Sequence, residues 1–161
     1  MKTGFFIITL ILSSIAMGQS NVPKDLKMVG KAMLEYSIFK FDVYEISFHK
    51  NESGEDMLQL VYQRDIKKEH SIMGWEEGMK PLLKKKPEHT DKFKWFITNT
   101  FEMKEKDVFQ IKRSSDFTVS LIKNNKLIAK KTDSDLYEMA FYPWLGEKPV
   151  DAKIKRKLLN K

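Results

Sequence analysis

Residues 142–159 read YPWLGEKPVDAKIKRKLL, and they constrain the architecture more tightly than any other part of the chain. Gly146 lies where a helix would end, and we expect it to adopt the left-handed backbone that glycine enters without steric cost. Pro149 suits the first turn of a new helix, where a missing N–H costs nothing. The apolar residues that follow recur every four positions: Val150, Ile154 and Leu158. The stretch therefore predicts helix, break, helix, with the second helix docked through a narrow face.

Strand patterns fill the first half of the chain. Residues 28–50 are rich in aromatic and β-branched side chains. Three of these share one parity and are expected to form the buried face of a strand: Phe39, Phe41 and Val43. The polar segment 51–56 (NESGED) predicts a turn. Residues 57–65 (MLQLVYQRD) predict the next strand, with these residues on one side: Leu58, Leu60 and Tyr62.

Helical spacing replaces this pattern after residue 66. Apolar residues between 67 and 83 are spaced by three and four, although Gly74 and Gly78 weaken the helix and Pro81 should kink or end it. The lysine run 84–86 and the proline after it predict a loop. A second helix is expected over about 88–104, with this stripe: Phe93, Phe96, Ile97, Thr100 and Phe101.

Three strands and a further helix complete the pattern. Residues 107–112 and 117–123 are predicted strands joined by a polar turn. Asn124 and Asn125 predict a two-residue hairpin loop into a third strand over 126–131, because Asn tolerates positive φ. Side-chain oxygens at 132–134 can cap a helix over about 135–144. Strands in blocks and helices in blocks predict an α+β fold, an antiparallel β-sheet covered on one face by helices.

The first 18 residues have the pattern of a signal peptide. Lys2 provides the positive start, residues 5–12 the apolar run and residues 13–18 the small-residue exit, with cleavage before Gln19. The apolar run is shorter than the roughly 20 residues of a spanning helix, so we expect cleavage rather than a membrane anchor. One domain, residues 19–161, then remains.

Composition narrows the chemistry. The chain has no cysteine, which excludes thiolate catalysis and, beside an export signal, favours a bacterial periplasm. His49, His70 and His89 have no metal-ligand spacing, so we expect no metal and no cofactor. The net charge of +7 comes mainly from lysine, which argues against nucleic acid as a partner. The basic surface is simply solvated or makes weak contact with an anionic membrane surface.

The order of predicted elements and three segments resemble the chalcone isomerase-like family, in particular its secreted bacterial branch. The segments are FDVYEISF at 41–48, LQLVYQRDI at 58–66 and WLGEKPVD at 144–151. The resemblance implies an open-faced β-sandwich whose large sheet is covered by helices. It extends over most of residues 28–159.

The plant enzymes of that family close a flavanone ring, and the resemblance implies a set of catalytic residues: Arg, Thr, Tyr, Asn, and Ser or Thr. Placed on this sequence without gaps, the corresponding positions fall near Lys27, Phe39, Ser71, Gly78 and Tyr137. None of these matches. A lysine can replace arginine as a cation but not as a bidentate clamp for an anion. We therefore expect no catalysis of the plant type and name no catalytic residue.

A ligand cleft between the sheet and the helices is the candidate site. Arg64 follows a strand and faces the first predicted helix, where it could bind a carboxylate or pair with a neighbouring acid. His70 could transfer a proton, or could be an ordinary histidine on a helix surface. Aromatic side chains at the cleft could also belong to the core. The candidate residues are Tyr36, Tyr62, Arg64, His70, Trp75 and Trp95.

Three functions stay open at this level. The first, which we predict, is an exported monomer that binds a small apolar or amphipathic ligand without catalysis; fatty acid is the ligand that the resemblance implies. The second is an isomerase or intramolecular lyase that uses residues other than those of the plant enzymes. The third is a structural or partner-binding envelope protein whose basic side faces a membrane or an acidic protein.

Overall fold

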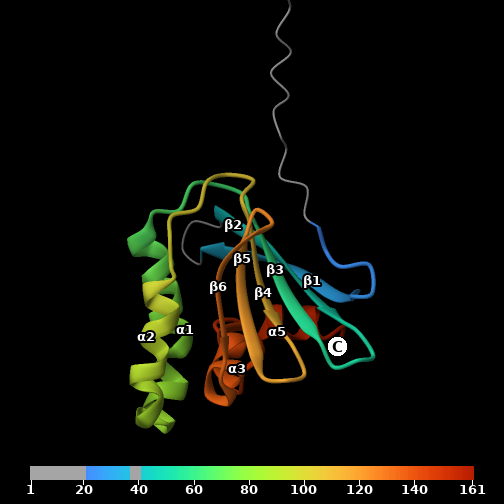
Figure 1. Cartoon of the computed structure of the whole chain (residues 1–161). Coiled ribbons are helices and arrows are strands. Elements are labelled where there is room, and N and C mark those ends of the chain that lie inside the picture. The colour runs from blue at the N-terminus through green and yellow to red at the C-terminus, as the bar shows by residue number, and fades with distance from the viewer. Residues whose placement is uncertain (1–20, 37–40) are drawn as a thin grey trace, which may run out of the picture.

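The computed structural model describes residues 21–36 and 41–161, without the side chains of Tyr36 and Phe41. The predicted signal peptide therefore lies outside the described residues. Within them, six antiparallel strands form one sheet in chain order (Figure 1). The strands are β1 (Lys27–Tyr36), β2 (Phe41–Lys50), β3 (Asp56–Tyr62), β4 (Val108–Arg113), β5 (Thr118–Lys123) and β6 (Lys126–Thr132).

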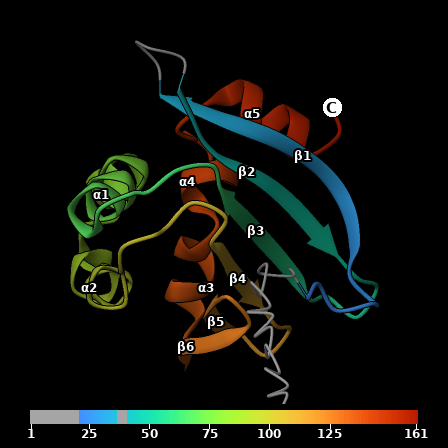
Figure 2. The ribbon, with the colours of Figure 1, turned by 90° about the horizontal axis from the view of Figure 1, so that it is seen from above.

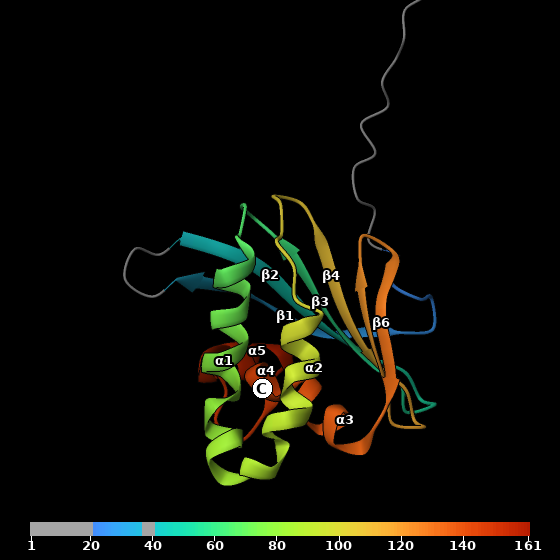
Figure 3. The ribbon, with the colours of Figure 1, turned by 60° about the vertical axis from the view of Figure 1, so that its left-hand side comes forward.

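The helices pack against one face of this sheet, as Figures 2 and 3 show. They are α1 (Lys68–Lys85), the 3₁₀ helix η1 (Pro87–His89), α2 (Thr90–Thr98), α3 (Ser134–Ala140), α4 (Tyr142–Leu145) and α5 (Ala152–Leu158). A single core joins buried residues of the sheet, such as Ile46 and Ile111, to helical residues such as Met79, Met139 and Leu158. The predicted α+β fold with one covered face is confirmed.

From Tyr44 onward, the buried residues on the core face of β2 are Tyr44, Ile46 and Phe48. We had assigned burial to the parity of Phe39, Phe41 and Val43. Of that set, Phe39 and the side chain of Phe41 lie outside the described residues, and Val43, which lies at a register shift between β1 and β2, is half-buried and packs against the core. The same parity continues into Ser47 and His49, which pair with each other through Oγ and Nε2 at 2.9 Å. A buried polar side chain needs a hydrogen-bond partner, which an apolar core cannot supply, and Ser47 and His49 supply one to each other.

The N-terminal segment, residues 21–26, contains a turn closed by the Leu26 N–H and the Pro23 carbonyl, and it is held by two loops of the sheet. The Asn21 N–H donates to Oδ1 of Asn125 in the β5–β6 hairpin, and Nδ2 of Asn51 after β2 donates to Oδ2 of Asp25. Leu26 at its end is buried, yet it is not part of the core under the helices.

Residues at hairpin loops and helix ends set several of the boundaries between elements. Asn124 and Asn125 have φ values of 48° and 65°, which confirms the two-residue hairpin. Asp133 accepts hydrogen bonds from the first N–H groups of α3, as a capping residue does. The helix predicted over 88–104 is shorter than expected, because Nδ2 of Asn99 donates to the Trp95 carbonyl and closes the last turn of α2. In contrast, α1 continues through Pro81 and includes Lys84 and Lys85 of the predicted loop, and Pro87 begins η1.

The C-terminal stretch folds as two short helices, with two corrections. Gly146 has φ −63° and ψ −179°, so it is extended and not left-handed. Glycine is required there because a Cβ would lie 2.5 Å from the Tyr142 carbonyl oxygen. The apolar stripe of α5 consists of the buried Ile154 and Leu158, whereas Val150 precedes the helix and is 45% exposed.

Candidate functional site

The structure brings part of the predicted cleft together. Tyr62 and Trp75 line an inner cavity between the sheet and the α1–α2 pair, and Trp95 packs edge-on against Phe96 at 5.0 Å near it. The volume of this inner cavity is about 20 Å³, enough for one water molecule. Arg64 lies exposed in the β3–α1 connection.

Arg64, His70 and Trp95 are not among the residues that line this cavity. His70 is exposed on the first turn of α1. The side chain of Tyr36 lies outside the described residues. The six predicted residues therefore stay a prediction as a set, with Tyr62 and Trp75 as the two that share a cavity wall.

Hydroxyl side chains of Tyr62, Ser71 and Thr100 line the inner cavity, and Tyr44 packs beside Tyr62. The Tyr44 hydroxyl oxygen accepts a hydrogen bond from Trp144 Nε1 at 2.9 Å. The ring centroids of Tyr44 and Tyr62 lie 5.3 Å apart. Burial raises the pKa of both phenols, so they stay protonated at neutral pH and cannot act as bases. The buried Ser71 Oγ, which also lines the cavity, has no hydrogen-bond partner among the described residues.

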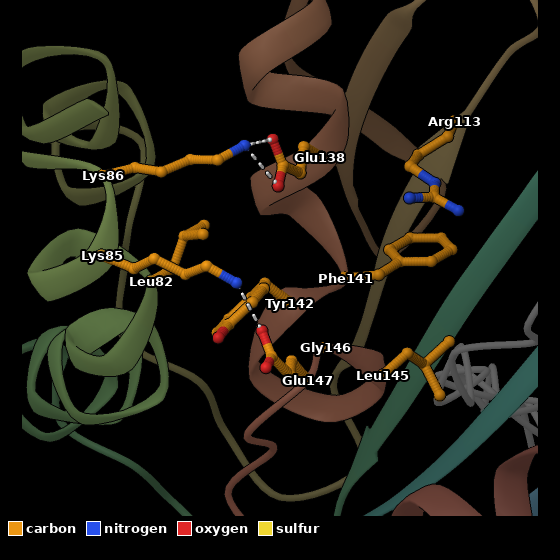
Figure 4. Close-up of a pocket in the computed structure, with 10 residues that line it drawn as sticks. All are labelled: Leu82, Lys85, Lys86, Arg113, Glu138, Phe141, Tyr142, Leu145, Gly146 and Glu147. Atoms are coloured by element: carbon orange, nitrogen blue, oxygen red, sulfur yellow. Dashed lines mark hydrogen bonds and ion pairs between the residues drawn. The ribbon is translucent and has the colours of Figure 1, made fainter. Parts of the chain in front are cut away.

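A second and much larger pocket lies between the end of α1, the α3–α4 turn and the end of β4 (Figure 4). Its volume of about 360 Å³ falls within the usual range for small-molecule sites. The floor is apolar and is made of Leu82, Phe141, Tyr142 and Leu145. None of these residues was among the candidates from the sequence. The pocket depends on α1 and the C-terminal helices meeting, which no local pattern predicts.

Two ion pairs span the pocket and connect the end of α1 to α3 and to the segment after α4. Lys85 Nζ lies 2.8 Å from Glu147 Oε2, and Lys86 Nζ lies 2.7 Å from Glu138 Oε2 (Figure 4). The hydrogen bond to Glu147 raises the pKa of Lys85, and the same contact lowers the pKa of Glu147. Both partners of the Lys85 pair are well exposed, so salt screens their attraction.

Arg113 forms one wall of this pocket. Its Nε donates to Asp56 Oδ1 at 2.8 Å, and its Nη2 donates to the second carboxylate oxygen, a bidentate pair. The guanidinium lies over the rings of Tyr137 and Phe141, at 4.3 and 3.9 Å from their centroids. We had placed Arg113 and Asp56 in polar turns, but they end β4 and begin β3. The one hint was an arginine in a chain whose cations are mostly lysine.

The molecule is thus a small α+β protein with an open antiparallel sheet, helices on one face and a pocket edged by lysines between α1 and the α3–α4 turn. A family model described as chalcone isomerase-like matches residues 24–160. The chain belongs to the chalcone isomerase-like family.

A crystal structure of a fatty-acid binding protein from Arabidopsis thaliana is similar in fold. The TM-score is 0.73 at 10% sequence identity, and the match covers 86% of this chain and 89% of that chain. At this identity the likeness shows a shared fold. No curated protein sequence matches the chain.

Two absences hold for residues 21–36 and 41–161. No cluster of three or more His, Asp or Glu side chains there could hold a metal ion. No helix in that part of the chain is both long and apolar enough to span a membrane.

Proposed function

We propose that this protein is a non-catalytic binder of a small amphipathic ligand, an apolar chain with a carboxylate, as in a fatty acid. The observation that carries the proposal is the 360 Å³ pocket, which combines an apolar floor with the ammonium groups of Lys85 and Lys86. A ligand carboxylate can take the place of Glu147 on Lys85, because the side chain of this glutamate is 66% exposed and can turn toward solvent. The fatty-acid binding neighbour supports this ligand class.

The structure also supports the non-catalytic part of the proposal. The position near Gly78, where the plant enzymes have Asn, has no room for a side chain: a Cβ there would lie 2.6 Å from Pro143. Ser71 replaces the catalytic Tyr at its ungapped position, and the nearby phenols of Tyr44 and Tyr62 stay neutral. These residues can orient a ligand by hydrogen bonds, but Ser71 and Gly78 are not the Tyr and Asn of the plant set.

We further propose that the chain is exported, is cleaved before Gln19 and works as a monomer in a bacterial periplasm. The signal-like pattern of residues 1–18 and the absence of cysteine support this location. Intact-mass analysis of protein from a periplasmic extract tests it. The expected mass is that of residues 19–161, and the mass of the uncleaved chain in the membrane fraction would contradict it.

The ligand is tested by extracting freshly purified protein with organic solvent and analysing the extract by mass spectrometry. We expect copurified fatty acid, and displacement of a fluorescent fatty acid by dodecanoate. Leu145→Glu places a negative charge on the pocket floor and should abolish binding. Leu127→Glu is the matched control, because Leu127 is 53% exposed on β6, away from the pocket.

Two results would overturn the proposal. Equal loss of binding in both variants, or binding that neither variant affects, would show that the pocket is not the site. Turnover of a chalcone by the purified protein would overturn its non-catalytic assignment and favour the isomerase alternative.

A further inference from the structure

The C-terminal segment, residues 146–161, concentrates the positive charge of this protein. It contains six basic and two acidic side chains, so it supplies more than half of the net charge of +7. Three of its cations are exposed on α5 at the spacing i, i+3, i+4, which places them on one side of the helix: Lys153, Arg156 and Lys157. We call these three residues the basic face of α5.

The acidic residues of the segment do not neutralise this face. Glu147 is bound to Lys85 across the pocket. Asp151 accepts hydrogen bonds from Lys153 N and Ile154 N as the capping residue of α5. Both carboxylates are therefore engaged. No ion pair is found for Lys153, Arg156 or Lys157 within residues 21–36 and 41–161.

The helix that carries the basic face is rigidly mounted. Ile154 and Leu158 are buried in the core, and Gly30 of β1 lies so close that a Cβ would approach the Lys157 carbonyl oxygen to 2.1 Å. Lys155 Nζ donates to the Gly146 carbonyl at 2.7 Å, which ties α5 to the wall of the ligand pocket. The basic face is thus held in one orientation on a helix that Lys155 ties to the pocket wall.

We propose that the basic face of α5 docks this protein on an anionic phospholipid surface. Lysine is suited to a diffuse layer of phosphate charge, because its compact ammonium needs no bidentate partner. The exposed Val150, between Lys148 and Lys153 in the chain, adds an apolar side chain that can enter the headgroup layer. Docking would bring the pocket next to the bilayer, where amphipathic ligands dissolve; this last consequence rests on the proposed function.

The test is the binding of the mature chain to vesicles, followed by co-sedimentation. One set of vesicles contains phosphatidylcholine alone, and the other contains phosphatidylcholine with phosphatidylglycerol. We expect binding to the anionic vesicles only, weakened by added salt. Removing the three cations of the basic face (K153Q, R156Q, K157Q) should lower the affinity about 100-fold.

A charge-matched control separates this face from net charge. The triple variant K126Q, K130Q, K131Q removes three exposed lysines from the edge strand β6 and should keep most of the binding. Equal losses in the two variants would overturn the proposal, as would equal binding to neutral vesicles. Tighter binding to soluble polyglutamate than to anionic vesicles would instead favour an acidic protein partner and also overturn it. Ligand binding in free solution is measured separately, so its failure leaves this test intact.

Discussion

Arg113 connects segments that are far apart in the sequence. It joins Asp56 at the start of β3 to the carbonyl of Tyr137 and the ring of Phe141. Arg113→Met leaves the buried carboxylate of Asp56 without its partner, and we expect a loss of about 3–5 kcal/mol in the free energy of unfolding. Urea denaturation measures it. Adding D56N to this variant should restore part of the loss, because no charge is then left unpaired; independent, additive effects would contradict the pairing.

His49 should make the fold sensitive to acid. It is buried, and its Nδ1 has no hydrogen-bond partner among the described residues. Burial lowers the pKa of its imidazole. In the unfolded chain, His49 titrates near pH 6.5, so below that pH the unfolded state binds more protons than the native state. The free energy of unfolding therefore falls as the pH drops below about 6.5.

Urea denaturation above and below that pH measures the effect. We expect His49→Gln to lose less stability on acidification than the wild type, because the titrating group is gone. His70→Gln is the control, since His70 is exposed and should behave as the wild type does. Identical pH dependence in all three proteins would show that His49 does not cause the acid sensitivity.

Which residues the sequence predicts well depends on the range of their interactions. The Asn124–Asn125 loop and the Asp133 cap act on their immediate neighbours, and both are confirmed. The contacts of the pocket join residues separated by 57 positions in Arg113–Asp56 and by 62 in Lys85–Glu147. A charge pair of that separation leaves no periodic trace, so sequence patterns predicted neither.

The docking of α5 on β1 depends on the close approach at Gly30. A Cβ at this position would meet the backbone oxygens of Lys157 and Leu158 at 2.1 and 2.7 Å, so the helix must move away. We expect Gly30→Ala to lower the free energy of unfolding by about 1–3 kcal/mol, as overpacking does. Faster hydrogen exchange confined to α5 should accompany the loss.

Gly74 in α1 is a matched control, because nothing lies within 4 Å of a Cβ added there. Gly74→Ala should stabilise the protein by about 0.5–1 kcal/mol through the better helix propensity of alanine. A Gly30→Ala variant as stable as the wild type would show that α5 is not held by this contact.

A helix can end before its apolar stripe does, when a side chain in its last turn bonds the backbone of that turn. Asn99 ends α2 by bonding the Trp95 carbonyl, and a length based on the apolar stripe alone was therefore too long. The buried face of β2 beyond Val43 could not be predicted from residues 38–44. Both parities carry apolar residues at 38–44, and the deciding contrast lies further on, between Ile46 and Phe48 on one side and Ser47 and His49 on the other.

The fold as a whole was predictable because every strand pairs with its neighbour in the chain. Four of the five pairings join strands linked by a short segment, which alternation and turn residues can specify, and only β3 and β4 must meet across the inserted α1 and α2. The pocket, in contrast, forms where α1 meets α4, two helices from different blocks of the sequence. Its existence depends on how the helices pack over the sheet, so only the covered face could be expected beforehand.

A ligand in this pocket touches α1, β4 and the α3–α4 turn together, so binding should stabilise the whole chain. Dodecanoate at about 100 times its dissociation constant contributes about 2.7 kcal/mol, which corresponds to a rise in Tm of about 5–10 °C. Differential scanning fluorimetry measures this shift. The rise should persist in Leu127→Glu and vanish in Leu145→Glu. A rise that persists in Leu145→Glu would place the ligand elsewhere, and the inner cavity beside Tyr62 and Ser71 would become the site to test.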